Sequence, residues 1–253
     1  MVLEGKGRGV TGTPMADQVG TSPFHEVLAP LAAEIVLAGA RLASGGLVAG
    51  TDGNVSARLP GGMVLVTPAG AAKGELSAGA LVVVDMAGRV VEGDGVPSTE
   101  LPLHLALYEA RPDVDAIVHA HPPTATGFAL AGEDFMAPVL PEIILGLGGV
   151  PLVPYATPGS QLLANSVAAA AVGHDALLLA NHGAVATGST VRQALWRMEC
   201  LEHAARTILT ARLLGRVTHL DPEQTRALYA MRDRARGGDV ASTVHTQFVR
   251  EEA

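Results

Sequence analysis

The stretch Asp115-Ala-Ile-Val-His-Ala-His-Pro-Pro123 decides how the rest of the chain is interpreted. Its apolar residues predict a short buried strand, and the two prolines predict where that strand ends. Because side chains alternate across a strand, His119 and His121 point to the same face. Two imidazoles at one strand end can bind one metal ion. A hydrogen-bonded histidine pair without a metal is the plainer alternative.

His182 extends this pair toward a complete metal site. It follows the apolar run Ala176-Leu-Leu-Leu-Ala180, so it is predicted at the end of a second strand. Catalytic zinc sites commonly hold three protein ligands and keep one position open. We therefore predict that zinc, or another divalent metal, is bound by His119, His121 and His182. Taken alone, His182 could equally be an ordinary loop histidine.

Glu100 is predicted near the start of a helix, directly after Ser98 and Thr99. The two hydroxyls could cap this helix and leave the carboxylate in its first turn, which is an ordinary place for an acid. Beside a divalent cation, a carboxylate can instead be a metal ligand at rest and an acid or base once substrate displaces it. We assign Glu100 this catalytic role, and His104, one helical turn later, a supporting one.

Three small turns are candidates for binding the anionic part of a substrate. Turns with short polar side chains present backbone N–H groups that can hold a phosphate or a carboxylate. Each is also an ordinary turn when taken alone. Lys73 could add positive charge nearby, although a solvated lysine is the simpler expectation. The predicted substrate-binding residues are Gly53, Asn54, Ala69, Gly70, Ser98 and Thr99.

The composition limits the classes of function. Of 253 residues, 48% are hydrophobic and 3% aromatic, so the chain can form a large core but has few rings for stacking on bases. The net charge of −8 argues against a nucleic-acid or acidic-membrane partner. The single cysteine, Cys200, excludes an internal disulfide and favours a reducing cytoplasm. We expect no signal peptide and no run of the ~20 apolar residues that span a bilayer.

Hydrophobic periods and turn signals predict one domain over residues 22–253, after a disordered lead over residues 1–21. Hairpins mixed with helices favour an α/β fold with a largely antiparallel sheet and helices on both faces. Predicted strands cover 55–58, 63–67, 81–85, 89–92, 115–120, part of 146–153, 176–181 and 184–188. Predicted helices cover 22–44, 100–110, 124–131, 161–173, 190–214 and 222–235.

Six short motifs together resemble the class II aldolase/adducin family, and within it the L-fuculose-1-phosphate aldolases. They occur in the family's order and spacing and cover roughly residues 25–220. The motifs are Gly50-Thr-Asp-Gly-Asn-Val-Ser56, Thr67-Pro-Ala-Gly70, Pro97-Ser-Thr-Glu100, Val118-His-Ala-His121, Val153-Pro-Tyr-Ala-Thr157 and Asn181-His-Gly183.

The resemblance implies a three-layer αβα domain around a mainly antiparallel sheet, and a homotetramer with active sites between subunits. It implies that the three histidines bind zinc, that Glu100 is the acid/base group, and that the small turns form a phosphate pocket. The implied reaction cleaves a ketose 1-phosphate, such as L-fuculose 1-phosphate, into dihydroxyacetone phosphate and an aldehyde, with the metal stabilising an enediolate.

Two departures from the family pattern keep other functions open. Ala69 replaces a hydroxyl residue of the Thr-Pro-(Ser/Thr)-Gly turn, and Glu142 stands where the fuculose-phosphate aldolases have a tyrosine that helps protonate the aldehyde. Metal-dependent decarboxylation of a hydroxy-aromatic or keto acid is the nearest alternative, because loss of CO₂ uses similar chemistry. An adducin-like interaction module is a third reading. It predicts missing metal ligands, whereas all three are present.

Overall fold

The computed structural model describes residues 23–235, and the predicted lead over residues 1–21 lies outside them. Its centre is one eight-stranded sheet with the order β4-β3-β2-β1-β5-β8-β7-β6. Neighbouring strands are antiparallel except β6 and β7, which are parallel. The strands are β1 (Asn54–Leu59), β2 (Met63–Val66), β3 (Val82–Asp85), β4 (Val90–Glu92), β5 (Ala116–Ala120), β6 (Leu152–Val153), β7 (Ala176–Leu179) and β8 (Gly183–Gly188).

Helices cover both faces of this sheet, as the sequence predicted. The α-helices are α1 (Pro23–Ser44), α2 (Leu101–Ala110), α3 (Pro123–Leu130), α4 (Gln161–Ala170), α5 (Val191–Leu214) and α6 (Pro222–Ala235). Two of them begin at hydroxyl caps: Ser160 Oγ accepts from the Leu163 N–H, and Thr190 Oγ1 accepts from the Gln193 N–H. Short helices are η1 (Lys73–Glu75), η2 (Ala78–Ala80) and the π-helix η3 (Ile143–Leu147).

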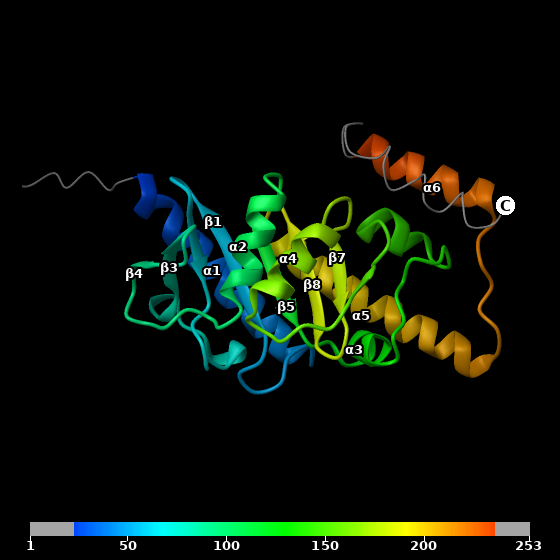
Figure 1. Ribbon diagram of the computed structural model, residues 1–253, viewed down its shortest axis with the longest axis horizontal. Coiled ribbons are helices and arrows are strands. Elements are labelled where there is room, and N and C mark those ends of the chain that lie inside the picture. Colours follow the sequence, from blue (N-terminus) through cyan, green and yellow to red (C-terminus); the bar gives the residue numbers. More distant parts are fainter. Residues whose placement is uncertain (1–22, 236–253) are drawn as a thin grey trace, which may run out of the picture.

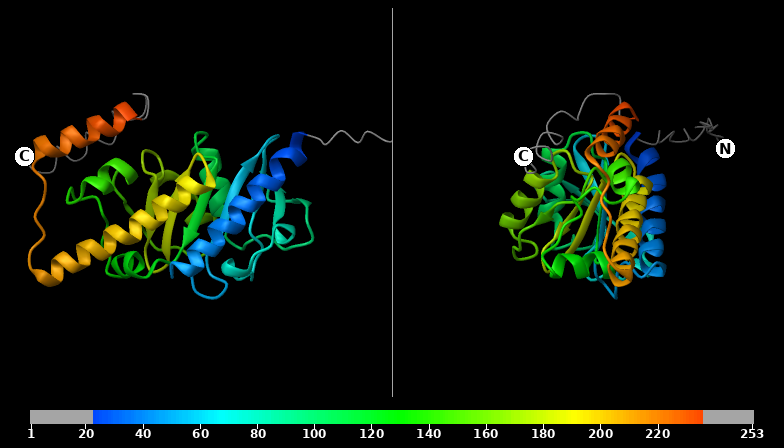
Figure 2. Two further views of the ribbon diagram at one scale, coloured as in Figure 1. Left: turned by 180° about the vertical axis from the view of Figure 1, so that it is seen from behind. Right: turned by 90° about the vertical axis from the view of Figure 1, so that its right-hand side faces the viewer.

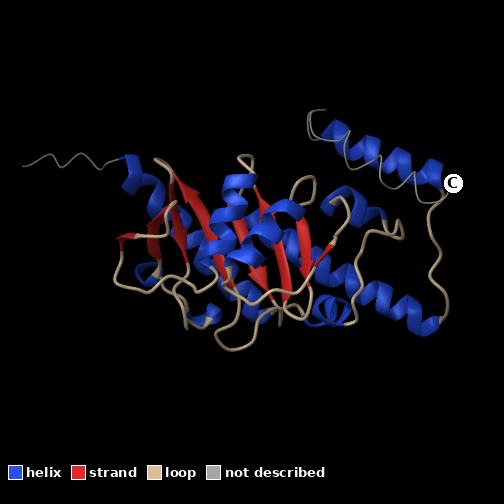
Figure 3. Cartoon of the chain, in the orientation of Figure 1, coloured by secondary structure: helices blue, strands red, loops and turns tan. Residues whose placement is uncertain are grey.

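The molecule has three layers. Helices α2 and α4 lie together in front of the sheet in Figure 1, whereas α1 and α5 cross its back in the left view of Figure 2. Figure 3 shows the strands as the middle layer between these helices. The predicted fold class, an α/β three-layer αβα domain around a mainly antiparallel sheet, is therefore confirmed.

Side-chain alternation along the strands builds two cores. On β5, Ala116, Val118 and Ala120 pack into the core shared with α1 and α5. Ile117 packs into the core shared with α2 and α4. His119 has the same parity as Ile117, so the strand directs its ring toward the α2 side of the sheet. The alternation that buries the apolar residues therefore also selects the face on which the site lies.

Helix α6 is held by charge at the far end of the sheet. It packs against η3, and Arg232 Nη2 lies 2.9 Å from Asp175 Oδ2. Asp175 is fully buried and also pairs with Arg111 and Arg197, at 3.4 and 3.0 Å. One buried carboxylate thus joins three guanidinium groups from three separate helices or their ends.

One expectation about the chain needs correction. Within the described residues, α1 is by length and composition apolar enough over Val27–Ser44 to cross a membrane. The sequence analysis expected no such stretch. Core helices pass the same test, and Ile35, Ala38 and Leu42 are buried in the core of this domain. The short helices η1, η2 and η3 were not predicted, because one or two turns carry no readable hydrophobic period.

Candidate metal centre

Three predicted histidines meet at one end of the sheet. His119 lies near the end of β5, His121 directly follows this strand, and His182 lies in the turn between β7 and β8. Their ring centroids are 4.8–5.2 Å apart. One ring nitrogen from each can be chosen so that all three lie within 4.8 Å of one another. The predicted metal-ligand set is therefore brought together.

The chemistry of these donors fits a divalent metal ion such as zinc. His119 Nδ1 donates a hydrogen bond of 2.9 Å to the carbonyl of Ala184, which leaves a lone pair on Nε2 for a metal. That Nε2 lies 3.3 Å from Nε2 of His121. Zn–N bonds of about 2.0–2.1 Å in a tetrahedral site place ligand nitrogens about 3.3 Å apart. The pair therefore already has the spacing that zinc requires.

Glu100 completes the cluster. Its Oε2 lies 3.0 Å from His119 Nε2, and its Oε1 lies 3.2 Å from His182 Nε2. Oε1 is buried and has no hydrogen-bond partner, as expected for an atom whose partner is a cation or a substrate. Asn54 Nδ2 donates to Oε2 at 3.0 Å. Both carboxylate oxygens thus face histidine nitrogens, and Oε2 is also held by Asn54.

The local start of α2 differs from the prediction. Glu100 itself is the N-cap residue, and its side chain makes no cap hydrogen bond because it is turned toward the histidines. Ser98 Oγ accepts only the N–H of Glu100, at 3.3 Å, so this hydroxyl does not cap the helix as expected. The Glu100 side chain therefore makes no stabilising cap on the helix, and its carboxylate lies at the metal centre instead.

Charges within the cluster shift the pKa values of its members. Burial alone would raise the pKa of Glu100, but His119 and His182 outweigh it and hold this pKa far below its usual range. Burial would lower the pKa of His119, but the Glu100 charge raises it overall. Burial and the charges of the other two histidines lower the pKa of His121. The carboxylate therefore stays ionised beside positive charge, as a metal ligand must.

Two glycines allow this close approach. A Cβ on Gly53, whose φ is +73°, would lie 2.7 Å from the carbonyl oxygen of His119. A Cβ on Gly183 would lie 2.5 Å from Cδ2 of His121 and 2.6 Å from the Ala120 carbonyl oxygen. Any larger residue at either position would displace the metal-binding strand or its histidines.

The turns predicted to bind phosphate differ in where the structure places their residues. Asn54 and Ser98 contact Glu100, whereas Thr99 and Gly70 are exposed. The N–H of Ala69 donates to the Val96 carbonyl at 2.8 Å, so it is not a free donor for an anion, contrary to expectation. This bond instead ties the residue 69–70 turn to the segment leading to Ser98.

Lys73 is also placed differently from the prediction. It is 1% exposed rather than solvated. Its ammonium donates to the carbonyls of Thr51 and Ala71, at 2.9 and 2.5 Å. Burial lowers the pKa of Lys73, and the charge of Asp52 partly opposes this. The lysine thereby joins two turns that flank the metal centre.

Sequence reasoning missed several residues of this region. Asp52 Oδ2 lies 3.4 Å from His121 Nδ1, and its place two residues before Asn54 was the available signal. Ser56 and Tyr108 form a buried chain of hydrogen bonds with His104. No sequence pattern pairs a strand with a particular helix, so these contacts could not be predicted.

Glu142, which replaces the expected tyrosine, is not part of this cluster in the described chain. It is exposed and is the N-cap residue of η3. Its charge acts elsewhere: burial and, to a lesser extent, Glu142 raise the pKa of the Cys200 thiol.

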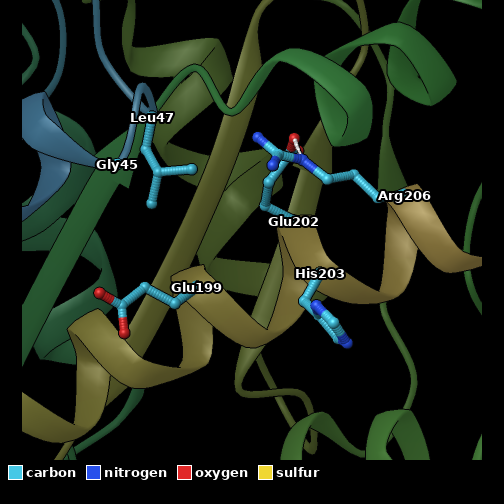
Figure 4. Close-up of a pocket in the computed structure, with 6 residues that line it drawn as sticks. All are labelled: Gly45, Leu47, Glu199, Glu202, His203 and Arg206. Carbon is cyan, nitrogen blue, oxygen red and sulfur yellow. Dashed lines mark hydrogen bonds and ion pairs between the residues drawn. The ribbon is translucent and has the colours of Figure 1, made fainter.

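A separate small pocket of about 220 Å³ lies against α5. The lining residues in Figure 4 are Glu199, Glu202, His203 and Arg206 of α5, together with Gly45 and Leu47, which follow α1. Glu202 Oε2 accepts from the N–H groups of Thr124 and Ala125 and so caps α3. None of the predicted site residues lines this pocket.

Comparison with known proteins agrees with this geometry. A family model described as the class II aldolase and adducin N-terminal domain matches residues 33–209. The chain is 39% identical over 180 residues to 3-oxo-tetronate 4-phosphate decarboxylase from Pectobacterium atrosepticum, covering 70% of this chain and 82% of that protein. It is 37% identical over 167 residues to L-fuculose phosphate aldolase from Escherichia coli K12, covering 65% and 76%.

A solved structure gives the same result. The crystal structure of YgbL from Klebsiella pneumoniae matches with a TM-score of 0.75 and 40% identity, and the match covers 79% of this chain and 98% of that one. Fold, histidine cluster and sequence matches agree. The chain therefore belongs to the class II aldolase and adducin family.

Proposed function

We propose that this protein is a divalent-metal-dependent carbon–carbon lyase that acts on a phosphorylated sugar or sugar acid. The observation that carries the proposal is the convergence of three histidine ring nitrogens with the Glu100 carboxylate. An adducin-like interaction module would not need these ligands or a carboxylate directed at them. The favoured reaction is decarboxylation of a 3-oxo sugar acid phosphate.

Each part of the centre has a task in such a reaction. His119, His121 and His182 would hold the cation, zinc being the ion that we propose. When bound, it supplies Lewis acidity that stabilises negative charge on a substrate oxygen. As the carbon–carbon bond breaks, its electron pair moves toward the neighbouring carbonyl group. Glu100 would move the proton at the carbon that gains this electron pair.

The replacement of the expected tyrosine by Glu142 favours decarboxylation. Retro-aldol cleavage requires removal of a proton from the hydroxyl group that becomes the aldehyde, so it needs a second acid/base group. Decarboxylation expels CO₂ and needs no such group. A glutamate, Glu142, stands at the place expected for the tyrosine, and it does not reach the cluster of its own subunit. The similarity to 3-oxo-tetronate 4-phosphate decarboxylases supports the same choice.

Aldol cleavage is the second candidate, and the sequence analysis ranked it first. It is supported by 37% identity to L-fuculose phosphate aldolase and by the acid/base position of Glu100. The substrate would be a ketose 1-phosphate such as L-fuculose 1-phosphate, with dihydroxyacetone phosphate as one product. Both candidates use the same metal and the same carboxylate, and they differ in the bond that breaks.

A substrate panel separates these functions. Purified protein is incubated with 3-oxo-tetronate 4-phosphate, L-fuculose 1-phosphate, related ketose phosphates, and hydroxy-aromatic and keto acids. Release of CO₂ that stops on chelation and returns with zinc supports decarboxylation, whereas formation of dihydroxyacetone phosphate supports the aldolase. Absence of bound metal, full folding after chelation and no turnover would favour the interaction module.

Assembly and location are proposals of the same kind. From the family resemblance we propose a homotetramer with active sites between subunits, which light scattering on the purified protein can test. From the charge and the single cysteine we propose a cytoplasmic protein without nucleic-acid or membrane partners. Fractionation of cells and binding assays with DNA and anionic vesicles are the corresponding measurements.

A further inference from the structure

A row of buried polar side chains leads away from Glu100 between β1 and α2. On β1, Asn54 and Ser56 are two residues apart and share one face. On α2 and its N-cap, Glu100, His104 and Tyr108 are each four residues apart and share one side. Two strand residues advance about 6.7 Å and four helix residues about 6.0 Å, so the two rows stay in step. The proposed function does not account for this row beyond Asn54.

Hydrogen bonds join the row into one chain. Asn54 Nδ2 bonds to Glu100 Oε2 at 3.0 Å, and Asn54 Oδ1 makes a short hydrogen bond with His104 Nε2. His104 Nδ1 lies 2.6 Å from Ser56 Oγ, which lies 2.8 Å from the Tyr108 hydroxyl. The exposed fractions are 2% for Asn54, none for Ser56 and His104, and 1% for Tyr108. Bulk solvent therefore does not reach these hydrogen bonds.

The chemistry of Glu100 sets the direction of every donor. An ionised carboxylate only accepts, so Asn54 must present its NH₂ to Glu100 and its oxygen to His104. His104 must then carry its proton on Nε2, which leaves Nδ1 to accept from the Ser56 hydroxyl. Ser56 in turn accepts from Tyr108. Each hydrogen therefore points toward Glu100, and the orientation of the Asn54 amide depends on the tautomer of His104.

Arg58 holds the Tyr108 end of the row in place. The Arg58 guanidinium lies over the Tyr108 ring, 4.6 Å from its centroid, and also donates to the Tyr108 backbone carbonyl. Arg58 Nε donates to the Val114 carbonyl at 2.7 Å. Burial raises the pKa of the Tyr108 hydroxyl, so this hydroxyl keeps its proton and remains a donor. The series of hydrogen bonds thus begins at the Tyr108 hydroxyl, a donor that is held in place, and ends at the catalytic carboxylate of Glu100.

We propose that His104, Ser56 and Tyr108 form a positioning relay that holds the Asn54 amide and, through it, the Glu100 carboxylate in the orientation needed for proton transfer. The proposal rests on the proposed role of Glu100. The relay keeps one carboxylate oxygen bonded to Asn54 while both oxygens face the histidine nitrogens of the metal centre. None of the three residues contacts the substrate or the reacting atoms, so each acts only through Asn54.

Activity measurements test the relay through a matched pair of variants. Ser56→Ala removes a relay hydroxyl, whereas Thr187→Val removes a buried hydroxyl of β8 that bonds the Asp175 carbonyl away from the site. Ser56→Ala should lower kcat on the order of 10–100-fold, as outer partners of metal sites do, with KM and bound zinc within about twofold of wild type. Thr187→Val should keep kcat within about twofold.

Two results of this comparison would overturn the relay. One is an equal kcat for Ser56→Ala and Thr187→Val, and the other is a loss in Ser56→Ala that lies wholly in KM or zinc content. Tyr108→Phe should cost less than Ser56→Ala, because its hydroxyl is one bond farther from Glu100. His104→Gln, which retains a donor and an acceptor, should keep more activity than His104→Phe. If His104→Phe does not fold, the serine and tyrosine variants still decide the matter.

A second readout does not depend on turnover. Long-range nitrogen–proton correlation spectra of the full-length zinc protein report which ring nitrogen of His104 carries the proton. The relay predicts the Nε2–H tautomer in wild type and a mixture of tautomers in Ser56→Ala. A dominant Nδ1–H form in wild type would overturn it. If wild type turns over none of the substrate panel, the proposed function fails, and these spectra alone decide the relay.

Discussion

Gly183 lies so close to His121 that a Cβ on the glycine would sit 2.5 Å from Cδ2 of the imidazole ring. The same Cβ would lie 2.6 Å from the backbone oxygen of Ala120, so the clash involves backbone as well as side chain. The glycine that follows one metal ligand therefore makes room for another.

Gly183→Ala should displace His121 and lower the bound zinc to well below one ion per chain. Zinc content of the purified variant, measured by mass spectrometry, checks this. Gly127→Ala in α3 is the control, because a Cβ there meets nothing within 4 Å. The control should keep its zinc and gain up to about 1 kcal/mol in helix stability. Full zinc binding by Gly183→Ala would contradict the model of a tightly packed site.

Glu100→Gln should keep the fold and the zinc but lower kcat on the order of 10²–10⁴-fold, because an amide cannot carry the proton. His119→Ala, by contrast, should lower the zinc content itself, since it removes a ligand. Steady-state kinetics and metal analysis on the two variants distinguish these effects. A near-native rate for Glu100→Gln would refute its acid/base role.

Lys73→Met should lower the free energy of unfolding by about 1–3 kcal/mol, because the carbonyls of Thr51 and Ala71 lose their buried donor. It should also raise KM, since the turns that flank the metal centre lose their link. Urea unfolding and kinetics measure the two effects. Arg89→Met, at a side chain that is 80% exposed, is the control and should change stability by less than about 1 kcal/mol.

Stability should fall in acid through His104. Burial and then the charge of His119 lower its pKa from 6.5 to about 3. The unfolded chain therefore binds a proton between these values that the folded chain excludes. The stabilising contribution of neutral His104 to the free energy of unfolding is fully present above pH 6.5. It is lost progressively as the pH falls toward 3.

His104→Gln removes this titration. Urea unfolding of the metal-free proteins at pH 7.5 and pH 5 measures the difference. Wild type should lose about 2 kcal/mol more than the variant between these two pH values. Equal losses would mean that His104 is protonated in the fold.

Asp175→Asn should destabilise the protein by about 3–5 kcal/mol, because Arg111, Arg197 and Arg232 would keep their charges without the buried carboxylate. Urea unfolding measures this change. Glu133→Gln, in an exposed pair with Arg212, provides the comparison and should cost no more than about 1 kcal/mol. Similar losses for both variants would show that the buried cluster adds little.

Much of the fold could be predicted because local patterns agreed with it. The alternation in β5 and the stripe of α1 each match a buried face, and His119, His121 and Glu100 follow from strand and helix ends. The relay could not be predicted, since Ser56 and His104 are 48 residues apart and meet only because β1 packs under α2. The burial of Lys73 likewise depends on carbonyls presented by two separate turns.

The agreement in pitch between β1 and α2 is approximate. Each further step along the two elements would add a mismatch of about 0.7 Å between a strand residue and its helical neighbour. Arg58, the next residue of the strand row, covers this mismatch with a long side chain and donates to the backbone carbonyls of Tyr108 and Arg111. The row therefore passes from short neutral side chains to a long charged one, whose guanidinium lies over the Tyr108 ring.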